Sequence, residues 1–202
     1  ESYFATVDYV SMHNHDTGSS SDALAAFVST GALQNSISYY SPSMGGFNFA
    51  AQYGVKEGAQ VDSPIALAAN YDAGPLHLGL GAEKNGSAKS IGLRALYELG
   101  AFTVGGYYER GTGTYSVDDG RAGTSAKGNA YRLAGMYTMG ASEIHLNVGR
   151  LTGADNVSRL NGNQWTVGYN YNLSKRTKVY TYYTDLNPTG SAADYNSFAV
   201  GI

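Results

Sequence analysis

The chain has 202 residues, a formal net charge of −3, 27 glycines, 18 tyrosines and no cysteine. A weakly acidic chain without a basic cluster gives no sign of nucleic-acid binding, and the lack of cysteine excludes disulfides and thiolate chemistry. No apolar run approaches the roughly 20 residues of a membrane-spanning helix. These exclusions leave the spacing of the apolar residues as the main source of information about the fold.

The first segment, residues 1–34, has no sustained strand period and is long for a simple connection. We interpret it as a loop. It contains the sequence SSSDALAAFV, which predicts a short helix with Ser21 as N-cap and Asp22 at its positive end. One alternative stays open: tyrosine and small apolar residues alternate over residues 2–10, which would then form a twelfth strand.

This segment also contains the residues that most resemble a metal site. His13 and His15 are followed by Asp16, which would supply half of a ligand set. Two histidines at this spacing in a polar loop, in a chain with only four histidines, are more typical of solvated loop residues. Asp118 and Asp119 lack the further ligands of a calcium loop. We therefore expect no metal and no cofactor.

From residue 35 onward the period of two dominates. In residues 163–173, Trp165, Val167, Tyr169 and Tyr171 fall on one face, and amide and hydroxyl side chains fall on the other. The same pattern predicts eleven strands: 35–41, 45–55, 65–71, 76–82, 91–99, 102–108, 131–137, 144–148, 163–173, 177–185 and 198–202.

The connections between these strands alternate between short and long, and we expect no exception. The short ones are residues 41–46, 72–75, 99–101, 139–141 and 174–176; the longer ones are 56–62, 84–89, 111–128, 152–163 and 187–194. Tight turns at one end and longer polar loops at the other are typical of a transmembrane antiparallel up-and-down β-barrel. The predicted fold class is therefore all-β.

The two faces of the strands support a barrel in lipid. One face mixes alanine, glycine, valine and leucine, which suit lipid tails, whereas a protein core would need larger side chains at high packing density. Tyrosines flank the tight turn at Lys175 and Arg176 in YNYNLSKRTKVYTYYTDLN. We expect these tyrosines at the boundary between membrane and water, where an aromatic ring and its hydroxyl find suitable surroundings.

The segments TVDYVS, NSISYYSPSMGGFNFAAQYG, TVGYNYNLSKRTKVYTYYTDLN and FAVGI resemble the general porins of Gram-negative outer membranes, in particular the beta-proteobacterial type. The resemblance implies a sixteen-stranded barrel in the cell outer membrane. It also implies a homotrimer that contacts membrane lipid and lipopolysaccharide and lets ions and small hydrophilic solutes diffuse passively.

By this resemblance, residues 1–34 correspond to the loop that folds into the barrel and constricts it, and residues 35–202 to barrel strands. The chain looks like the C-terminal two-thirds of such a porin. Because an odd number of strands leaves unpaired backbone groups in lipid, we expect further strands before Glu1 and a few residues after Ile202.

The resemblance and the alternation together suggest which residues line the pore. The candidates for the pore wall and the constriction are Asp8, His13, His15, Asp16, Ser38, Tyr40, Arg94 and Arg132. Ser38 and Tyr40 occupy pore-facing positions where relatives often carry a basic residue. This difference predicts a weaker positive field at the constriction than in anion-selective relatives.

Other classes of function have less support. The sequence has no G-x-S-x-G, H-E-x-x-H or phosphate-binding glycine loop, so an enzyme is not expected. A barrel that serves adhesion or receptor roles through its loops remains an alternative, although only residues 111–127 and 152–163 are substantial loops. A soluble all-β binding module, such as a lectin, would need a packed interior.

If residues 1–34 fold into the pore, their charges should control which ions pass. Asp8→Asn and Asp16→Asn should each lower the preference for cations in single-channel recordings. His13→Ala/His15→Ala should remove a fall in cation preference between pH 7.5 and 5.5, because an ordinary imidazole gains its proton near pH 6.5. Unchanged conductance, selectivity and pH response in all three variants would exclude this segment from the pore.

Overall fold

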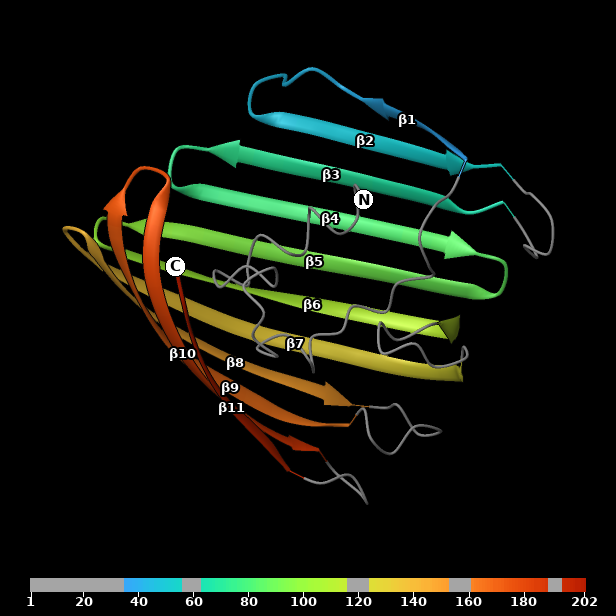
Figure 1. The fold of residues 1–202 in the computed structure, drawn as a ribbon. Helices are drawn as coiled ribbons and strands as arrows, with labels where there is room; N and C mark the ends of the chain where they lie inside the picture. Colours follow the sequence, from blue (N-terminus) through green and yellow to red (C-terminus); the bar gives the residue numbers. More distant parts are fainter. Residues whose placement is uncertain (1–34, 56–62, 116–123, 153–160, 189–193) are drawn as a thin grey trace.

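A computed structural model of the chain describes residues 35–55, 63–115, 124–152, 161–188 and 194–202. These residues form one antiparallel sheet in which each strand pairs with the next along the chain (Figure 1). The strands are β1 (Ser36–Tyr40), β2 (Phe47–Gly54), β3 (Ile65–Ala73), β4 (Leu76–Asn85), β5 (Ala88–Leu99), β6 (Phe102–Tyr115), β7 (Thr124–Met139), β8 (Ser142–Thr152), β9 (Gly162–Ser174), β10 (Thr177–Pro188) and β11 (Tyr195–Gly201).

The predicted all-β class and its eleven strands are confirmed, and the sheet curves into part of a barrel wall (Figure 1). Strands β1 and β11 form the two edges of the sheet in the described part of the chain. Among the described residues there is no helix with the length and apolar character needed to cross a bilayer. The order of the strands places the five tight turns at one end of the sheet, which we call the turn end.

The expected alternation of short and long connections is wrong at one hairpin. Residues 84–89 were expected to form a longer loop, but Asn85 pairs with Ala88 and only Gly86 and Ser87 lie between the strands. Gly86 has φ of 60°, and glycine at the first position of a two-residue connection suits the tight turns that join antiparallel strands. The paired strands therefore continue to the end of this hairpin.

The expected loop at residues 111–128 is also too long. Strand β6 continues to Tyr115 and β7 begins at Thr124, with Gly111 paired to Gly128 and Gly113 to Ala126. Threonine, serine and glycine at these positions hide the alternation of apolar residues. The backbone ladder nevertheless continues, because pairing needs only amide and carbonyl groups.

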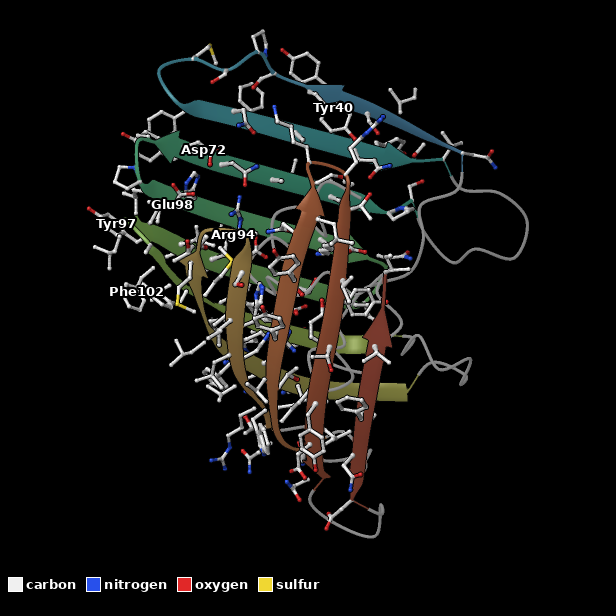
Figure 2. All side chains as sticks on the ribbon, turned by 60° about the vertical axis from the view of Figure 1, so that its left-hand side comes forward. Tyr40, Asp72, Arg94, Tyr97, Glu98 and Phe102 are labelled. Carbon is white, nitrogen blue, oxygen red and sulfur yellow. The ribbon has the colours of Figure 1, made fainter. Side chains whose placement is uncertain are left out.

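Apolar and polar side chains occupy opposite faces of the sheet, as the alternation predicts. Outward-facing apolar residues are exposed on every strand; examples are Leu67, Leu93, Leu133, Leu146 and Val200. In Figure 2, Tyr97 and Phe102 project from this outer face beside the turn end. Soluble monomers rarely expose contiguous apolar surface, so an apolar face that extends over all the described strands indicates contact with a partner or a membrane.

Aromatic pairs mark two levels of the outer face. Near the turn end, the ring centroids of Phe47 and Tyr71 lie 4.3 Å apart and those of Phe102 and Tyr137 lie 4.4 Å apart. Toward the other end, the corresponding distances are 5.1 Å for Tyr108 and Tyr131 and 5.3 Å for Trp165 and Tyr183. Two aromatic belts that flank an apolar band are a feature of outer-membrane barrels.

The expectation that the tyrosines around Lys175 lie at the membrane boundary is wrong for two of them. Tyr169 and Tyr171 are exposed on the outer face, but Tyr180 and Tyr182 lie on the inner face, where their rings stack 5.1 Å apart. Tyr182 is only 1% exposed. Alternation explains the difference, since Tyr180 pairs with Asn170 and Tyr182 with Gly168, both of which face inward.

Two outward-facing glycines of the sheet differ in the space around them and provide a test of packing. A Cβ atom added at Gly106 would lie 2.7 Å from the carbonyl oxygen of Arg132, whereas one at Gly135 would meet no atom closer than 4.0 Å. Gly106→Ala should therefore lower the free energy of unfolding by about 1–3 kcal/mol, the usual cost of overpacking. Urea unfolding in detergent measures the change. Gly135→Ala is the matched control, and an equal loss in both variants would contradict the steric explanation.

Candidate functional site

The inward-facing side of the sheet, which we call the inner wall, collects the polar and charged side chains of the strands. Its buried members include Gln52, Glu83, Ser90, Arg94, Glu109, Arg132, His145, Asn147, Gln164, Thr166, Asn170 and Thr184. These residues come from eight strands, namely β2 and β4 to β10. On β3, Asn70 and Asp72 also face inward. The inner wall therefore gathers the buried polar side chains of the described strands.

Two arginines lie at the same level of the inner wall. The pairing of Arg94 with Tyr107, and of Tyr107 with Arg132, places all three residues in one row across β5, β6 and β7. The guanidinium carbon of Arg132 lies 5.7 Å from the centroid of the Tyr107 ring, within the range of a cation–π interaction. The tyrosine ring thus separates two positive charges and contacts one of them.

Glycine positions give these arginines room to lie along the wall. Arg94 Nη2 donates to Asn70 Oδ1 over 3.1 Å, and Gly79, which pairs with both residues, lies between them without a side chain. On the other side, a Cβ atom at Gly149 would lie 3.7 Å from Arg132 Nε. Each arginine therefore has a glycine beside it in the same row.

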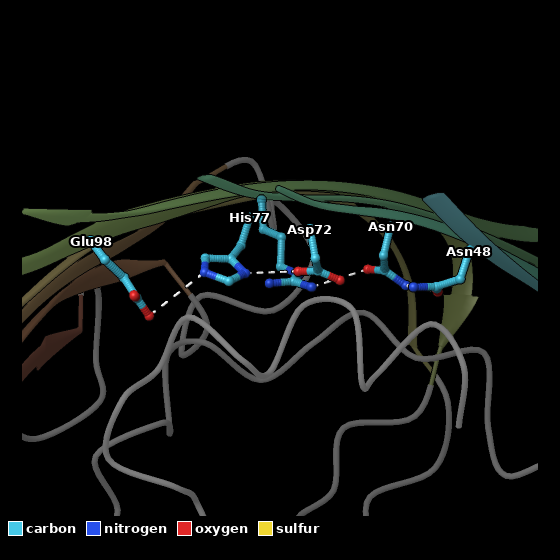
Figure 3. Close-up of polar contacts among 6 residues, drawn as sticks. Asn48, Asn70, Asp72, His77 and Glu98 are labelled. Atoms are coloured by element: carbon cyan, nitrogen blue, oxygen red, sulfur yellow. Dashed lines mark hydrogen bonds and ion pairs between the residues drawn. The ribbon is translucent and has the colours of Figure 1, made fainter. Parts of the chain in front are cut away.

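A second polar cluster lies between this row and the turn end. His77 Nδ1 lies 2.8 Å from Asp72 Oδ1, and His77 Nε2 lies 3.6 Å from Glu98 Oε1 (Figure 3). Asn70 continues the cluster by donating to Asn48 Oδ1 over 3.2 Å. Figure 3 shows these side chains on the same side of the curved sheet, where they form a continuous polar strip.

A third cluster, on β8, β9 and β10, forms a hydrogen-bond network around Asn170. Asn170 Nδ2 lies 3.0 Å from Glu143 Oε2 and 2.9 Å from His145 Nε2, while Asn172 Nδ2 donates to Glu143 Oε1 over 2.7 Å. Tyr182 donates its hydroxyl proton to Asn170 Oδ1 over 3.3 Å. Asn170 thereby joins three strands through its one amide group.

The three groups give the inner wall charges of both signs. Three or more histidine, aspartate or glutamate side chains in an arrangement that would hold a metal ion do not occur in the described part of the chain. His77 contacts Asp72 through Nδ1 and Glu98 through Nε2. The two carboxylates therefore lie on different sides of the imidazole ring and do not converge on one point. The wall can attract, repel and orient ions and polar solutes.

The structure places four of the eight candidate pore residues. Arg94 and Arg132 are 8% and 3% exposed on the inner wall. Ser38 and Tyr40 share this face, because Ser38 pairs with the inward-facing Gln52 and Tyr40 with Ala50. The other candidates (Asp8, His13, His15 and Asp16) lie outside the described residues. So do the expected loop and helix of residues 1–34 and the alternative strand at residues 2–10.

Several inner-wall residues were not singled out from the sequence. His77, Asn70 and Tyr107 fall on the polar face by alternation, so the sequence predicts which face they occupy. It does not predict their partners, because the contacts between side chains on different strands depend on the register of the strands. The same is true of Asn170, whose three partners come from β8 and β10.

Comparison with known proteins agrees with this architecture. The profile of a family described as Gram-negative porin matches residues 2–191. The outer membrane porin protein 32 of Delftia acidovorans is 29% identical over 161 residues, which cover 72% of this chain and 44% of the relative. This chain therefore spans about half the length of the curated relative it matches.

Solved structures give the same picture. An anion-selective porin from Comamonas acidovorans has a TM-score of 0.65 and 28% identity, covering 78% of this chain and 50% of that one. A Rhodopseudomonas blastica porin mutant has a TM-score of 0.61 at 19% identity, covering 84% and 55% of the two chains. OmpF of Salmonella typhi reaches 0.63 at 12% identity, covering 79% and 56%, so the last two similarities concern the fold alone.

The Asn170 network predicts a measurable difference between two neighbouring asparagines. Asn170→Leu should lower the free energy of unfolding by about 2–3 kcal/mol, because it removes one hydrogen bond from each of Glu143, His145 and Tyr182. Asn172→Leu removes one bond to Glu143 and should cost about 1 kcal/mol. Urea unfolding followed by the fluorescence of Trp165, the single tryptophan, measures both. Equal losses would show that Asn170 is not the centre of the network.

Proposed function

This chain belongs to the Gram-negative porin family, and we propose that it forms much of the wall of a water-filled channel in the outer membrane. The channel would let ions and small hydrophilic solutes diffuse passively, without a catalytic step. The observation that carries this proposal is the separation of the two faces of one sheet into an apolar outer surface and a charged inner wall.

The cost of exposing the outer face to water supports a place in lipid. Leu133 is 67% exposed, Phe198 69% and Val200 68%. Apolar surface in water costs about 25 cal/mol per Å², and lipid tails remove that cost. The inner wall has the opposite requirement, since Arg94, Glu109 and Arg132 need water or polar partners. A barrel with lipid outside and water inside satisfies both faces.

We further propose that the complete porin assembles as a homotrimer and contacts membrane lipid and lipopolysaccharide. Trimeric assembly is typical of the family that the sequence resembles. Residues 1–34 would fold inward as the constriction, with Asp8 and Asp16 opposite the positive row of the wall. This arrangement would set acidic and basic groups across a narrow passage, where a transverse field sorts solutes by charge.

The arginine row is the part of the wall that we expect to act on anions. Arg94 and Arg132 lie at one level, with Asp72, Glu98 and Glu143 nearer the turn end. Glu83 and Glu109 lie beyond the row, on the side away from the turn end. An ion that crosses the channel would therefore meet acidic, basic and again acidic levels of the wall in sequence. Low-dielectric walls strengthen such fields relative to an open surface.

If the chain forms a channel, the protein should conduct ions, and the arginine row should influence whether anions or cations pass more easily. The purified protein should form single channels in a planar bilayer. Arg94→Gln and Arg132→Gln should each lower the anion-to-cation permeability ratio about fivefold, because one unit charge at roughly 8 Å in water changes the free energies of an anion and a cation by about 0.5 kcal/mol each, in opposite directions. Reversal potentials in a salt gradient measure this ratio.

Two control variants separate charge from geometry and from position. Arg94→Lys keeps the charge but loses the planar guanidinium, so its selectivity should stay near that of the wild type. Arg150→Gln removes an exposed cation that faces outward and should leave selectivity unchanged. A protein that forms no channels would refute the proposed function, and channels insensitive to both arginine variants would refute only the role of the row.

A further inference from the structure

Five basic residues face outward on five successive strands, at the end of the sheet opposite the turn end. This set, which we call the basic belt, consists of Lys84, Lys89, Arg110, Lys127 and Arg150, all of them exposed. The three lysines of the belt lie in one row across neighbouring strands, because Lys84 pairs with Lys89, Lys89 with Thr112, and Thr112 with Lys127. Four strands thus carry three lysines in one row.

The remaining two cations of the belt extend it toward the middle of the sheet. Arg150 pairs with Tyr131 in the row of the Tyr108–Tyr131 aromatic pair, and Arg110 lies two positions along β6 from Tyr108. Residues two positions apart on one face are separated by about 7 Å along a strand. The belt therefore covers roughly 14 Å of the strand direction, beginning at the aromatic level.

Among the described residues of β4 to β8, acidic side chains do not occur on the outer face. The acidic residues of the described parts of β4 to β8 are Glu83, Glu98, Glu109 and Glu143, and all of them face inward. None of the five cations forms an ion pair with a described residue. The outward face of β4 to β8 is therefore positive in its described part.

The direct pairing of Lys84 with Lys89 carries an energetic cost. Side chains directly opposite on one face have Cβ atoms about 4.5–5.5 Å apart, and like charges at this distance destabilise the pair. Lys127 shares their row two strands away from Lys89. An anion with several acceptor oxygens placed over this row would remove the repulsion and gain charge-assisted hydrogen bonds.

The position of the belt indicates where such an anion comes from. Aromatic rings lie at the membrane–water interface, so residues just beyond Tyr108 and Tyr131 reach the headgroup layer. In outer-membrane barrels the longer loops face the outside, and the belt lies at the end away from the turn end, where four of the five connections are longer. If the chain functions as the proposed channel, the belt faces the headgroups of the outer leaflet.

We propose that the basic belt is a binding site for the phosphate groups of lipid A, the anchor of lipopolysaccharide. One phosphate lies over the row of Lys84, Lys89 and Lys127 and is held by their positive charges. Arg110 and Arg150 can bind phosphate oxygens in a bidentate manner. The acyl chains then lie along the apolar outer face next to Ile91, Leu93 and Leu133. The site needs no movement of the sheet.

Binding of purified diphosphoryl lipid A to the detergent-solubilised protein tests the proposal. Lys84→Gln/Lys89→Gln/Lys127→Gln should weaken binding on the order of a hundredfold, since each basic residue near an anionic lipid surface contributes about fivefold. Arg94→Gln/Arg132→Gln removes two inward-facing cations and should bind as the wild type does. Equal binding by the triple variant, or an equal loss in the inward-facing control, would overturn the proposal.

Further measurements identify the ligand and distinguish a loss of binding from a loss of folding. Phosphatidylglycerol and inorganic phosphate should bind at least tenfold more weakly than lipid A; equal binding would make the belt a general anionic surface and overturn the lipid A assignment. Lys84→Gln alone should match or exceed the stability of the wild type without lipid, and should gain less thermal stability when lipid A is added. A greater gain would contradict the phosphate site.

Conductance separates this inference from the proposed function. The triple variant should keep the single-channel conductance and selectivity of the wild type, because its substitutions face away from the inner wall. Loss of lipid A binding with normal conductance supports the site. A wild-type protein that binds lipid A but never conducts would refute the channel and leave the site standing.

Discussion

The backbone ladder is the constraint on which the rest of this structure depends. Each strand from β2 to β10 pairs with two neighbours, so its amide and carbonyl groups are satisfied within the sheet. In lipid this is a requirement, because an unpaired backbone group there has no water to replace its partner. Once the ladder is formed, alternation assigns every second side chain to lipid and the others to the inner wall.

Register then converts this separation of faces into particular sites. One row runs through Asn70, Gly79, Arg94, Tyr107 and Arg132. It exists because the pairing register of five neighbouring strands places these residues directly beside one another. Glycine contributes at Gly79 by leaving space that a larger side chain would fill, and Arg94 uses that space to reach Asn70. The same alignment brings Lys84 opposite Lys89 on the outer face. Selectivity and lipid binding, as we propose them, are two consequences of one register.

The places where sequence and structure disagree have local physical causes. The connection at residues 84–89 looked long because its lysines and serine are polar, yet glycine allows a two-residue turn and the lysines belong to strands. The strands around residues 116–123 extend further than expected, since glycine and threonine can pair without showing an apolar period. Tyr180 and Tyr182 were grouped with the boundary tyrosines because they lie in the same tyrosine-rich segment. Their alternate positions along β10 place both side chains on the inner wall.

The sequence by itself determined the strands, the two faces and the family, because a period of two and a set of turn residues are local properties of the chain. Only the tertiary structure decided which side chains meet. A strand shifted by two residues keeps every side chain on its face, so alternation cannot distinguish the two registers. The ladder and the turn lengths make that choice, and they thereby bring Asn170 to Glu143 and Arg132 to the Tyr107 ring.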